Sequence, residues 1–476
     1  MTQYPEELAP VDRPLQSRGW GLVKDAVRGT AEDYTEGTIG RALVLLAVPM
    51  VLETVMESVF ALADVFWVSR LGAAAVTTIG LTETLLTLLY TIAMGLSIGV
   101  TATVARRMGE KDPDGASRAT VQAIALGAGL SAVIGVLGTV YAAELLALLG
   151  AAPDVIESGS GYTRIMFAGN ATILLLFLLN AAFRGVGDAV IAMRVLWIAN
   201  GLNMVLDPIL IFGWGPFPEL GIEGAAVATN LGRGTAVAIQ LVTLARSTGR
   251  LRVRRRHLRV DLPATWRLIR LSGTGTFQMF VSTASWIVLV RILSDYGTGV
   301  IAGYTIAIRL VVFALLPSWG LSNAAATMVG QALGAGKPDR AARAARLAGF
   351  YNMAFLGATG IVFIAFAPTI VSWFTTEPEP LEWGARGLRI VAFGFPFYAW
   401  GMVLTQSFNG AGDTWTPTWI ALACFWGIEQ PAAWILSRGL DLGPTGVFLA
   451  ITVAYSAVAV VSGVLFRRGG WKSAVA

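Results

Sequence analysis

Apolar stretches long enough to cross a lipid bilayer recur along nearly the whole chain. A helix needs about 20 apolar residues to span a hydrocarbon core of about 30 Å, and twelve such stretches stand between polar or glycine-rich breaks. This pattern predicts an all-α polytopic membrane protein with twelve transmembrane helices. The expected spans are 42–68, 76–104, 119–142, 162–182, 188–213 and 222–245, then 268–294, 299–330, 344–373, 384–407, 413–436 and 445–466.

The second half of the chain repeats the first. Identical residues stand 225 positions apart in five places: Gly72 and Gly297, Gly109 and Gly334, Pro113 and Pro338, Arg118 and Arg343, and the Phe-x-Gly-x-Gly-Asp turns that end at Asp188 and Asp413. Because six spans per copy is an even number, both copies enter the membrane in the same direction, as in transporters whose halves are related by an axis along the membrane normal. We therefore expect two six-helix bundles that face each other across a central cleft.

Composition supports a membrane protein and argues against an enzyme. Of the 476 residues, 55% are hydrophobic and 14% are charged, too few polar groups to surround a water-soluble core. Cys424 is the only cysteine and there is one histidine, so neither an intrachain disulfide nor a zinc site is expected. The chain also lacks a His-Glu-x-x-His motif and a cysteine nucleophile in a catalytic setting. No cofactor is expected beyond a coupling ion.

Basic residues collect in alternate loops, which predicts the orientation in the membrane. Basic loops face the cytoplasm in most membrane proteins, so both termini are expected inside, in the inner (plasma) membrane of a prokaryote. The N-terminus carries acids at Glu6, Glu7 and Asp12 and therefore does not resemble a cleavable signal peptide. The basic positions are Arg106, Arg107, Lys111 and Arg118; Arg246, Arg250, Arg252, Arg254, Arg255, Arg256 and Arg259; Lys337, Arg340, Arg343 and Arg346; and Arg467, Arg468 and Lys472.

These signals divide the chain into five parts. A cytoplasmic segment covers residues 1–40, with a weakly amphipathic stretch from Trp20 to Val27 that is expected to rest on the inner leaflet. The N-terminal lobe is 41–246, a basic linker is 247–265, the C-terminal lobe is 266–468 and a tail is 469–476. The linker is expected to face anionic lipid rather than nucleic acid.

Two aspartates inside predicted spans occur only in the first copy. Asp64 falls on Leu289 in the repeat, and Asp207-Pro208 falls on Gln430-Pro431 after a slip of two residues. Ionisable groups within the membrane are costly and commonly functional. The difference between the copies also argues against a channel lined equally by both halves.

The two aspartates are expected to form one site with other oxygen donors. Both lie roughly 9–12 Å inside the outer ends of their spans at about 1.5 Å per residue. Asn203 precedes Asp207 by one helical turn, and Thr229 reaches a similar depth. Pro208 also leaves the carbonyl of Met204 without its usual helical partner. These groups can hold Na⁺ or a proton; alternatively, each aspartate only forms local hydrogen bonds.

Three further acids suggest a second role. Glu53 and Glu57 share one stripe of the first span with Asp64, and Glu83 lies near the same depth in the second span. They could bind a cationic substrate or relay protons, or they could be protonated or internally paired. Partners for Glu429, Arg291, Arg309 and Arg389 cannot be assigned from the sequence. Aromatic and methionine residues such as Met279, Trp286 and Tyr398 suit an adaptable apolar wall, although such residues also serve as simple helix packing.

Several of these residues together resemble the multidrug and toxic compound extrusion (MATE) family. The similar segments are Pro49-x14-Asp64-x7-Gly72, Asn203-x3-Asp207-Pro208, Gly221-x2-Gly-Ala-Ala-x-Ala-Thr229 and the paired Gly-Asp turns at Asp188 and Asp413. The resemblance covers roughly residues 42–466.

The resemblance implies an antiporter that exports organic cations while H⁺ or Na⁺ flows inward. It implies an ion site at Asp64, Asn203, Asp207 and Thr229, small organic cations and membrane lipids as partners, no nucleic acid, and a monomer. Some branches of the family also use acids in the seventh or tenth span, and this sequence has none in the core of 268–294 or 384–407. Glu53, Glu57 and Glu83 are outside the general family pattern.

The main alternative is a flippase for a lipid-linked oligosaccharide or another amphiphilic lipid. A pyrophosphate cargo favours a cleft lined by arginine or lysine, whereas the spans of the first copy carry acids. Arg291 and Arg309 in the second copy keep this alternative open.

Overall fold

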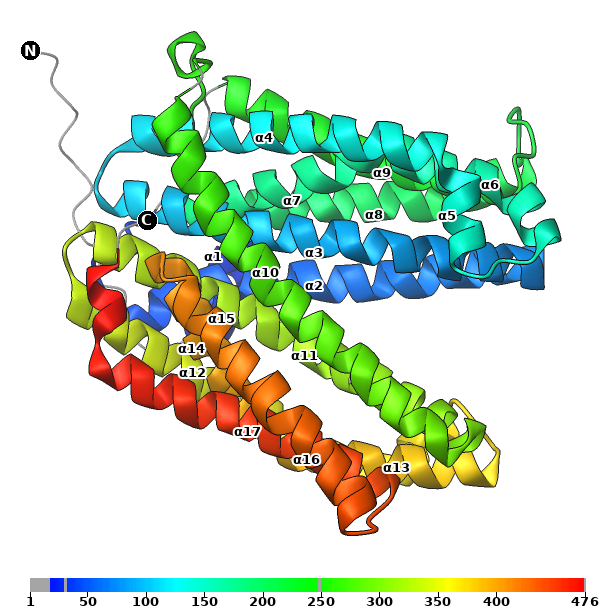
Figure 1. The fold of residues 1–476 in the computed structure, drawn as a ribbon. Coiled ribbons are helices and arrows are strands. Elements are labelled where there is room, and N and C mark those ends of the chain that lie inside the picture. Colours follow the sequence, from blue (N-terminus) through cyan, green and yellow to red (C-terminus); the bar gives the residue numbers. More distant parts are fainter. Residues whose placement is uncertain (1–17, 30–31, 247–249, 260, 475–476) are drawn as a thin grey trace, which may run out of the picture.

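The computed structural model describes residues 18–29, 32–246, 250–259 and 261–474, and helices dominate these ranges (Figure 1). The predictions for Glu6, Glu7 and Asp12 lie outside the described residues, as do parts of the predicted linker and tail. The helices of the first half are α1 (Arg18–Arg28), α2 (Ile39–Val68), α3 (Ala73–Gly109), α4 (Pro113–Val140), α5 (Ala142–Leu148), α6 (Pro153–Ala168), α7 (Asn170–Gly185), α8 (Ala189–Phe212) and α9 (Ile222–Arg246).

The second half has the same order of long helices. They are α10 (Leu262–Leu293), α11 (Thr298–Gly334), α12 (Pro338–Ser372), α13 (Pro378–Phe393), α14 (Phe395–Ala411), α15 (Trp415–Ala421), α16 (Gln430–Trp434) and α17 (Pro444–Arg468). Two π-helical segments, Leu422–Glu429 and Ile435–Gly439, flank α16. The fourth, tenth and eleventh predicted spans are therefore each built from more than one helical piece.

The all-helical membrane fold expected from the sequence is confirmed. Ten segments of the described chain are long and apolar enough to cross a membrane, and the pair α13–α14, bent by 56°, makes eleven if it is one span. α9 occupies the place of the sixth predicted span but is less apolar, because it carries Glu223 and Arg233. With α9 the helices follow the twelve-span order of the sequence.

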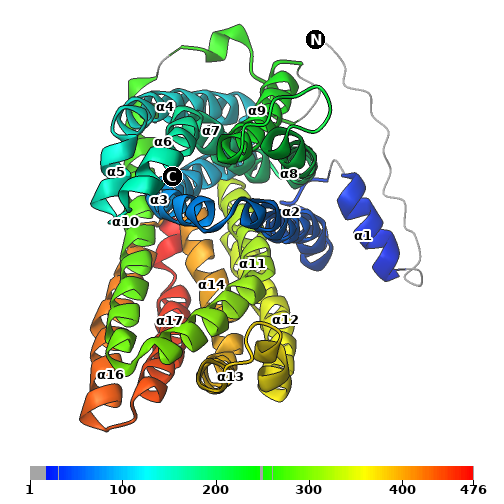
Figure 2. The same ribbon diagram turned by 90° about the vertical axis from the view of Figure 1, so that its right-hand side faces the viewer.

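The helices form two lobes that meet at one end and diverge at the other. α2–α9 make the N-lobe and α10–α17 the C-lobe; Figure 1 shows them converging at the end where the C-terminus and the basic loops lie, and Figure 2 views the opposite, divergent end. α10 and α11 of the C-lobe pack onto α3 and α2 of the N-lobe. Leu46 and Met50 of α2 belong to one buried cluster with Ala325 and Met328 of α11.

Glycines allow the two lobes to touch through their backbones at the convergent end. A Cβ atom on Gly109 of α3 would lie 2.0 Å from the carbonyl oxygen of Gln331 on α11, and one on Gly95 would lie 2.2 Å from Oγ1 of Thr276 on α10. Small residues permit such close helix packing in membranes. The amide of Gln331 also donates to the carbonyl of Gly185 at 2.8 Å, which links α11 to the end of α7.

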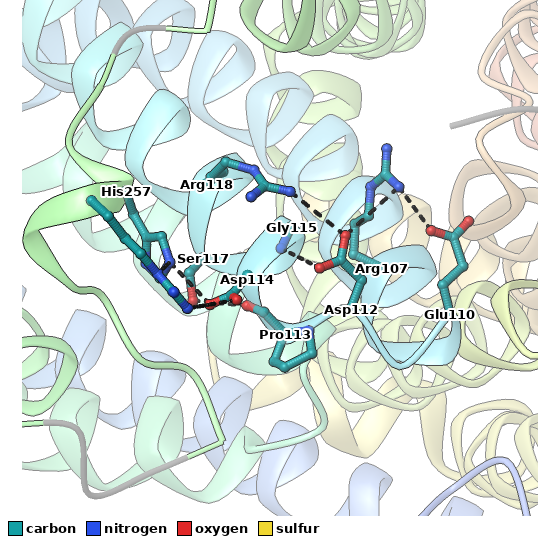
Figure 3. A network of polar contacts seen from close by, with 10 residues as sticks. Arg107, Glu110, Asp112, Pro113, Asp114, Gly115, Ser117, Arg118 and His257 are labelled. Carbon is teal, nitrogen blue, oxygen red and sulfur yellow. Dashed lines mark hydrogen bonds and ion pairs between the residues drawn. The ribbon is translucent and has the colours of Figure 1, made fainter.

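The basic linker folds back onto the start of α4 (Figure 3). Asp112 caps α4 by accepting from the backbone N–H of Gly115 at 2.7 Å. In the first turn of α4, Asp114 binds Arg256 at 2.6 Å and His257 at 3.0 Å. At least one linker arginine is therefore paired within the protein.

A short segment before α2, Glu32–Gly37, lies between the lobes at the convergent end; we call it the strap. The Arg340 guanidinium of α12 donates to the carbonyl oxygens of Tyr34, Glu36 and Gly37. On the other side, the buried Tyr34 ring packs against Gly187 in the α7–α8 turn, where an added Cβ would lie 2.5 Å away. The strap therefore contacts both lobes.

Candidate functional site

Three of the four residues predicted for the ion site lie in mutual contact inside the N-lobe. Gly232 lets α9 approach α8, since a Cβ there would lie 2.7 Å from the carbonyl oxygen of Ala199. In the amide orientation that satisfies both neighbours, Asn203 donates to Oδ2 of Asp207 at 2.9 Å and accepts from Oγ1 and N–H of Thr229 at 3.1 and 3.0 Å. All three side chains are buried.

Asp207 retains one unused acceptor in this cluster. Its Oδ1 atom is buried and has no hydrogen-bond partner in the described part of the chain. Asp64 of α2 is half-buried and close enough for its charge to act on Asp207. We call Asp64, Asn203, Asp207 and Thr229 the oxygen cluster.

The oxygen cluster fits a proton or a hard monovalent cation better than a transition metal. Its donors are carboxylate, amide and hydroxyl oxygens, which suit hard cations, and the unused Oδ1 of Asp207 offers a place for one. Across the described ranges no group of three or more His, Cys, Asp or Glu side chains is placed to hold a metal ion.

Glu53 is internally paired. The Arg184 guanidinium of α7 lies 2.9 Å from Oε1 of Glu53, and both side chains are largely buried. Asn180 donates to the same oxygen at 3.2 Å and accepts in turn from Gln240 at 2.6 Å. Of the two alternatives for Glu53, internal pairing therefore describes its surroundings.

Glu57 and Glu83 are in more open positions. Glu57 is exposed and, like Glu53, lines a cavity between the lobes. Glu83 is also exposed, on α3, but lines neither of the two large cavities. The stripe of acids on the first span thus contains residues with different neighbours.

Two adjoining cavities lie between the lobes. The N-lobe cavity has a volume of about 310 Å³ and is lined by Glu53, Glu57, Arg184 and Arg233 together with amide side chains. The C-lobe cavity has a volume of about 440 Å³ and an uncharged lining that includes Trp286, Tyr398 and Tyr455. Six residues line both cavities: Tyr90, Met94, Met279, Leu316, Trp319 and Gln406. No residue of the oxygen cluster lines either one.

Arg233 also lies in this region, and the sequence pattern did not predict it as a site residue. It lies on α9 one turn after Thr229 and donates from Nη2 to the Tyr90 hydroxyl at 3.1 Å. The signal that could have identified it is a cation within a predicted span.

The C-lobe also has a buried carboxylate. Glu429, at the end of a π-helical segment, accepts from the hydroxyl of Ser285, which in turn accepts from Gln430 at 2.7 Å. Glu429 is 1% exposed.

Leu289 of the C-lobe, which matches Asp64 in the repeat, is packed in the apolar core. The arginines of the C-lobe have partners other than Glu429. Arg291 pairs with Asp295 at 3.2 Å on the surface, and Arg389 donates to the carbonyl of Ile364 at 3.2 Å.

Comparison with known proteins gives consistent matches over both halves. The family model described as MatE matches residues 49–209 and 276–435. The probable multidrug resistance protein YoeA of Bacillus subtilis is 26% identical over 423 residues, which cover 88% of this chain and 91% of that protein. The FAD transporter of Shewanella oneidensis is 29% identical over 352 residues, which cover 72% and 76%.

A solved structure has the same fold. It is described as the outward-facing conformation of a multidrug resistance MATE family transporter, and it aligns with a TM-score of 0.85 at 24% identity. The alignment covers 91% of this chain and 96% of that one.

Proposed function

This chain belongs to the MATE family of membrane transporters, and we propose from that premise that it exports cationic or lipophilic organic compounds in exchange for inward H⁺ or Na⁺. The observation that carries the proposal is the separation of two kinds of site. Asn203, Asp207 and Thr229 of the oxygen cluster are buried between α8 and α9, whereas the cavities lie between the lobes. An antiporter needs a place for the ion and a place for the cargo.

The arrangement of the lobes supports alternating access. They join at the end that carries the basic loops, which faces the cytoplasm by the positive-inside rule, and diverge at the other end (Figure 1). This is the form of an outward-open transporter in a bacterial plasma membrane, with both termini inside. Rocking the lobes about the cavities would expose the cavities to the cytoplasm.

Neutralisation of the oxygen cluster provides the coupling. In the outward-open state, H⁺ or Na⁺ binds at Asp64 and Asp207 and removes the cost of carrying uncompensated charge through the closed state. The ion then leaves on the cytoplasmic side, and the charged cluster favours the state that accepts new cargo.

The cavity linings support an organic cation as cargo. Glu57 offers a carboxylate in the N-lobe cavity, and the rings of Trp286, Tyr398 and Tyr455 offer aromatic surfaces in the C-lobe cavity. A second candidate is an amphiphile with a phosphate group, as a flippase would carry, because Arg184 and Arg233 also line the N-lobe cavity. The relative named FAD transporter gives that candidate some support. Arg184, however, is already paired with Glu53.

Ethidium efflux from proteoliposomes tests the proposal and identifies the ion. We expect efflux when a pH gradient or a sodium gradient is imposed, and lipid movement without ethidium efflux would favour the flippase. Asp207→Asn and Asp64→Asn are each expected to reduce gradient-driven efflux to the level of empty liposomes. The reason is that an uncharged amide can neither accept the proton nor offer a negative charge to Na⁺. Glu219→Gln, in an exposed loop, is the control. Full efflux by a folded Asp207→Asn protein would reject the ion site.

A further inference from the structure

Arg233 lies between the oxygen cluster and the N-lobe cavity. It follows Thr229 by four residues on α9, so the two side chains leave the same helix face one turn apart. Thr229 belongs to the oxygen cluster, whereas Arg233 lines the cavity together with Glu57. One face of α9 therefore connects the ion site with the cargo site.

The Arg233 guanidinium has no close ion-pair partner within the described ranges. No carboxylate oxygen there lies within the 4.0 Å of an ion pair. Its Nη2 atom donates to Tyr90, and its Nη1 atom is buried without a hydrogen-bond partner. Arg184 in the same cavity differs, because its contact of 2.9 Å with Glu53 holds it in place.

Three acids lie beyond ion-pair distance of Arg233 but within range of its charge. Its charge acts on Glu57 in the cavity, on Asp64 in the oxygen cluster and on Glu83 of α3. Asp64 in turn acts on Asp207. Attraction between charges grows as they approach and is weakly screened away from water. The preferred position of the guanidinium therefore depends on which acids are charged.

We propose that Arg233 couples ion binding to cargo release by pairing in turn with Asp64 and with Glu57. The inference rests on the antiport function proposed above. When Asp64 and Asp207 are charged, they attract Arg233 and leave Glu57 to bind an organic cation. When an ion neutralises them, Arg233 moves to Glu57 and displaces the cargo. Tyr90 holds the guanidinium between the two positions, and Arg233 is a positioning residue.

A double-mutant cycle on cargo binding tests this role. Tetraphenylphosphonium binding to the purified full-length protein is measured by calorimetry for the wild type, Asp64→Asn, Arg233→Gln and the double variant. Asp64→Asn imitates the neutralised site, so we expect it to weaken binding about tenfold, within the range typical of coupled sites. In the Arg233→Gln background the same change is expected to have no effect, and Arg233→Lys is expected to restore it.

Additivity would overturn the role of Arg233. If Asp64→Asn weakens binding by the same factor with and without Arg233, the aspartate acts on the cargo directly. If Arg233→Gln does not fold, the cycle of Asp64→Asn with Glu57→Gln decides, since removal of the Glu57 charge must also abolish the effect. An additive cycle in a protein that exports ethidium rejects the coupling role alone, whereas absence of gradient-driven ethidium efflux rejects the antiport itself.

Discussion

At the scale of the residue, helical spacing predicts which side chains share a face but not which partner each one meets. Helical spacing puts Glu53 and Glu57 on one stripe of α2, yet Glu53 pairs with Arg184, 131 positions away in the chain, and Glu57 faces a cavity. Asn203 and Asp207 are one turn apart, so their contact followed from the sequence, whereas the contact with Thr229 depends on how α9 packs.

The pairing of Glu53 predicts a stability effect that Glu57 does not share. Glu53→Gln leaves the Arg184 charge largely buried without its carboxylate, and removal of one partner from a buried ion pair costs about 3–5 kcal/mol. We expect a clear fall in the thermal unfolding temperature of the detergent-solubilised protein. Glu57→Gln is the matched control and is expected to unfold like the wild type. Equal unfolding temperatures of the two variants would show that the Glu53–Arg184 pair contributes little.

At the scale of the element, the apolar pattern predicted the long helices well and their interruptions poorly. The fourth span is predicted to begin at residue 162, whereas α6 begins at Pro153. The prediction starts too late because Asp154 and Glu157 give the first turns of α6 the polar composition of a loop. The eleventh span was predicted as one helix, whereas π-helical segments divide it beside Glu429. Such bulges depend on packing against neighbouring helices and leave little mark on hydrophobic periodicity.

The strap predicts a specific role for Arg340. Arg340→Ala removes its hydrogen bonds to Tyr34, Glu36 and Gly37, and a hydrogen bond from a charged donor contributes about 1.5–3 kcal/mol. We expect the lobes to separate more easily at the cytoplasmic end. Ser272 of α10 is buried and donates to the carbonyl of Leu96 on α3, across the contact between the lobes. A Ser272→Cys reporter should then react roughly tenfold faster with a maleimide added from inside, since about 1.4 kcal/mol corresponds to tenfold. Arg343→Ala, an exposed arginine on the same helix, is the control, and equal rates in both would contradict the role of the strap.

The labelling rate of the same reporter, divided by the rate for a free thiol at each pH, is expected to be insensitive to pH between about 5 and 8. Partial desolvation alone would raise the pKa of Asp33 in the strap, but hydrogen bonds from Thr35 and the charges of Lys111 and Lys337 lower it below 3.8. A carboxylate with a lowered pKa stabilises the folded form above its ordinary pKa, and that contribution is lost only as the pH falls through the lowered value. Asp33 therefore keeps its charge over the whole range.

At the scale of the whole molecule, the internal repeat predicted two lobes, but not how closely they touch at one end. The contact at Gly109 places α3 against the backbone of Gln331. Gly109→Ala is expected to push the cytoplasmic ends apart, raise the labelling of the Ser272→Cys reporter and lower ethidium efflux. Gly129→Ala, where an added Cβ has nothing within 4 Å, should change neither. Unchanged labelling in Gly109→Ala would show that the lobes can pack without this contact.

The grip of Arg340 on the strap is directed at main-chain oxygens rather than at side chains. The contact between Arg340 and the strap therefore depends on the path of the backbone, which the Asp33–Thr35 turn and the positive φ of Gly37 (65°) help to set. A substitution at Glu36 that preserves this path should therefore leave the closure intact, whereas one at Gly37 that straightens the path should loosen it. The identity of the side chain at position 36 would then say little about whether a relative holds its strap in the same way.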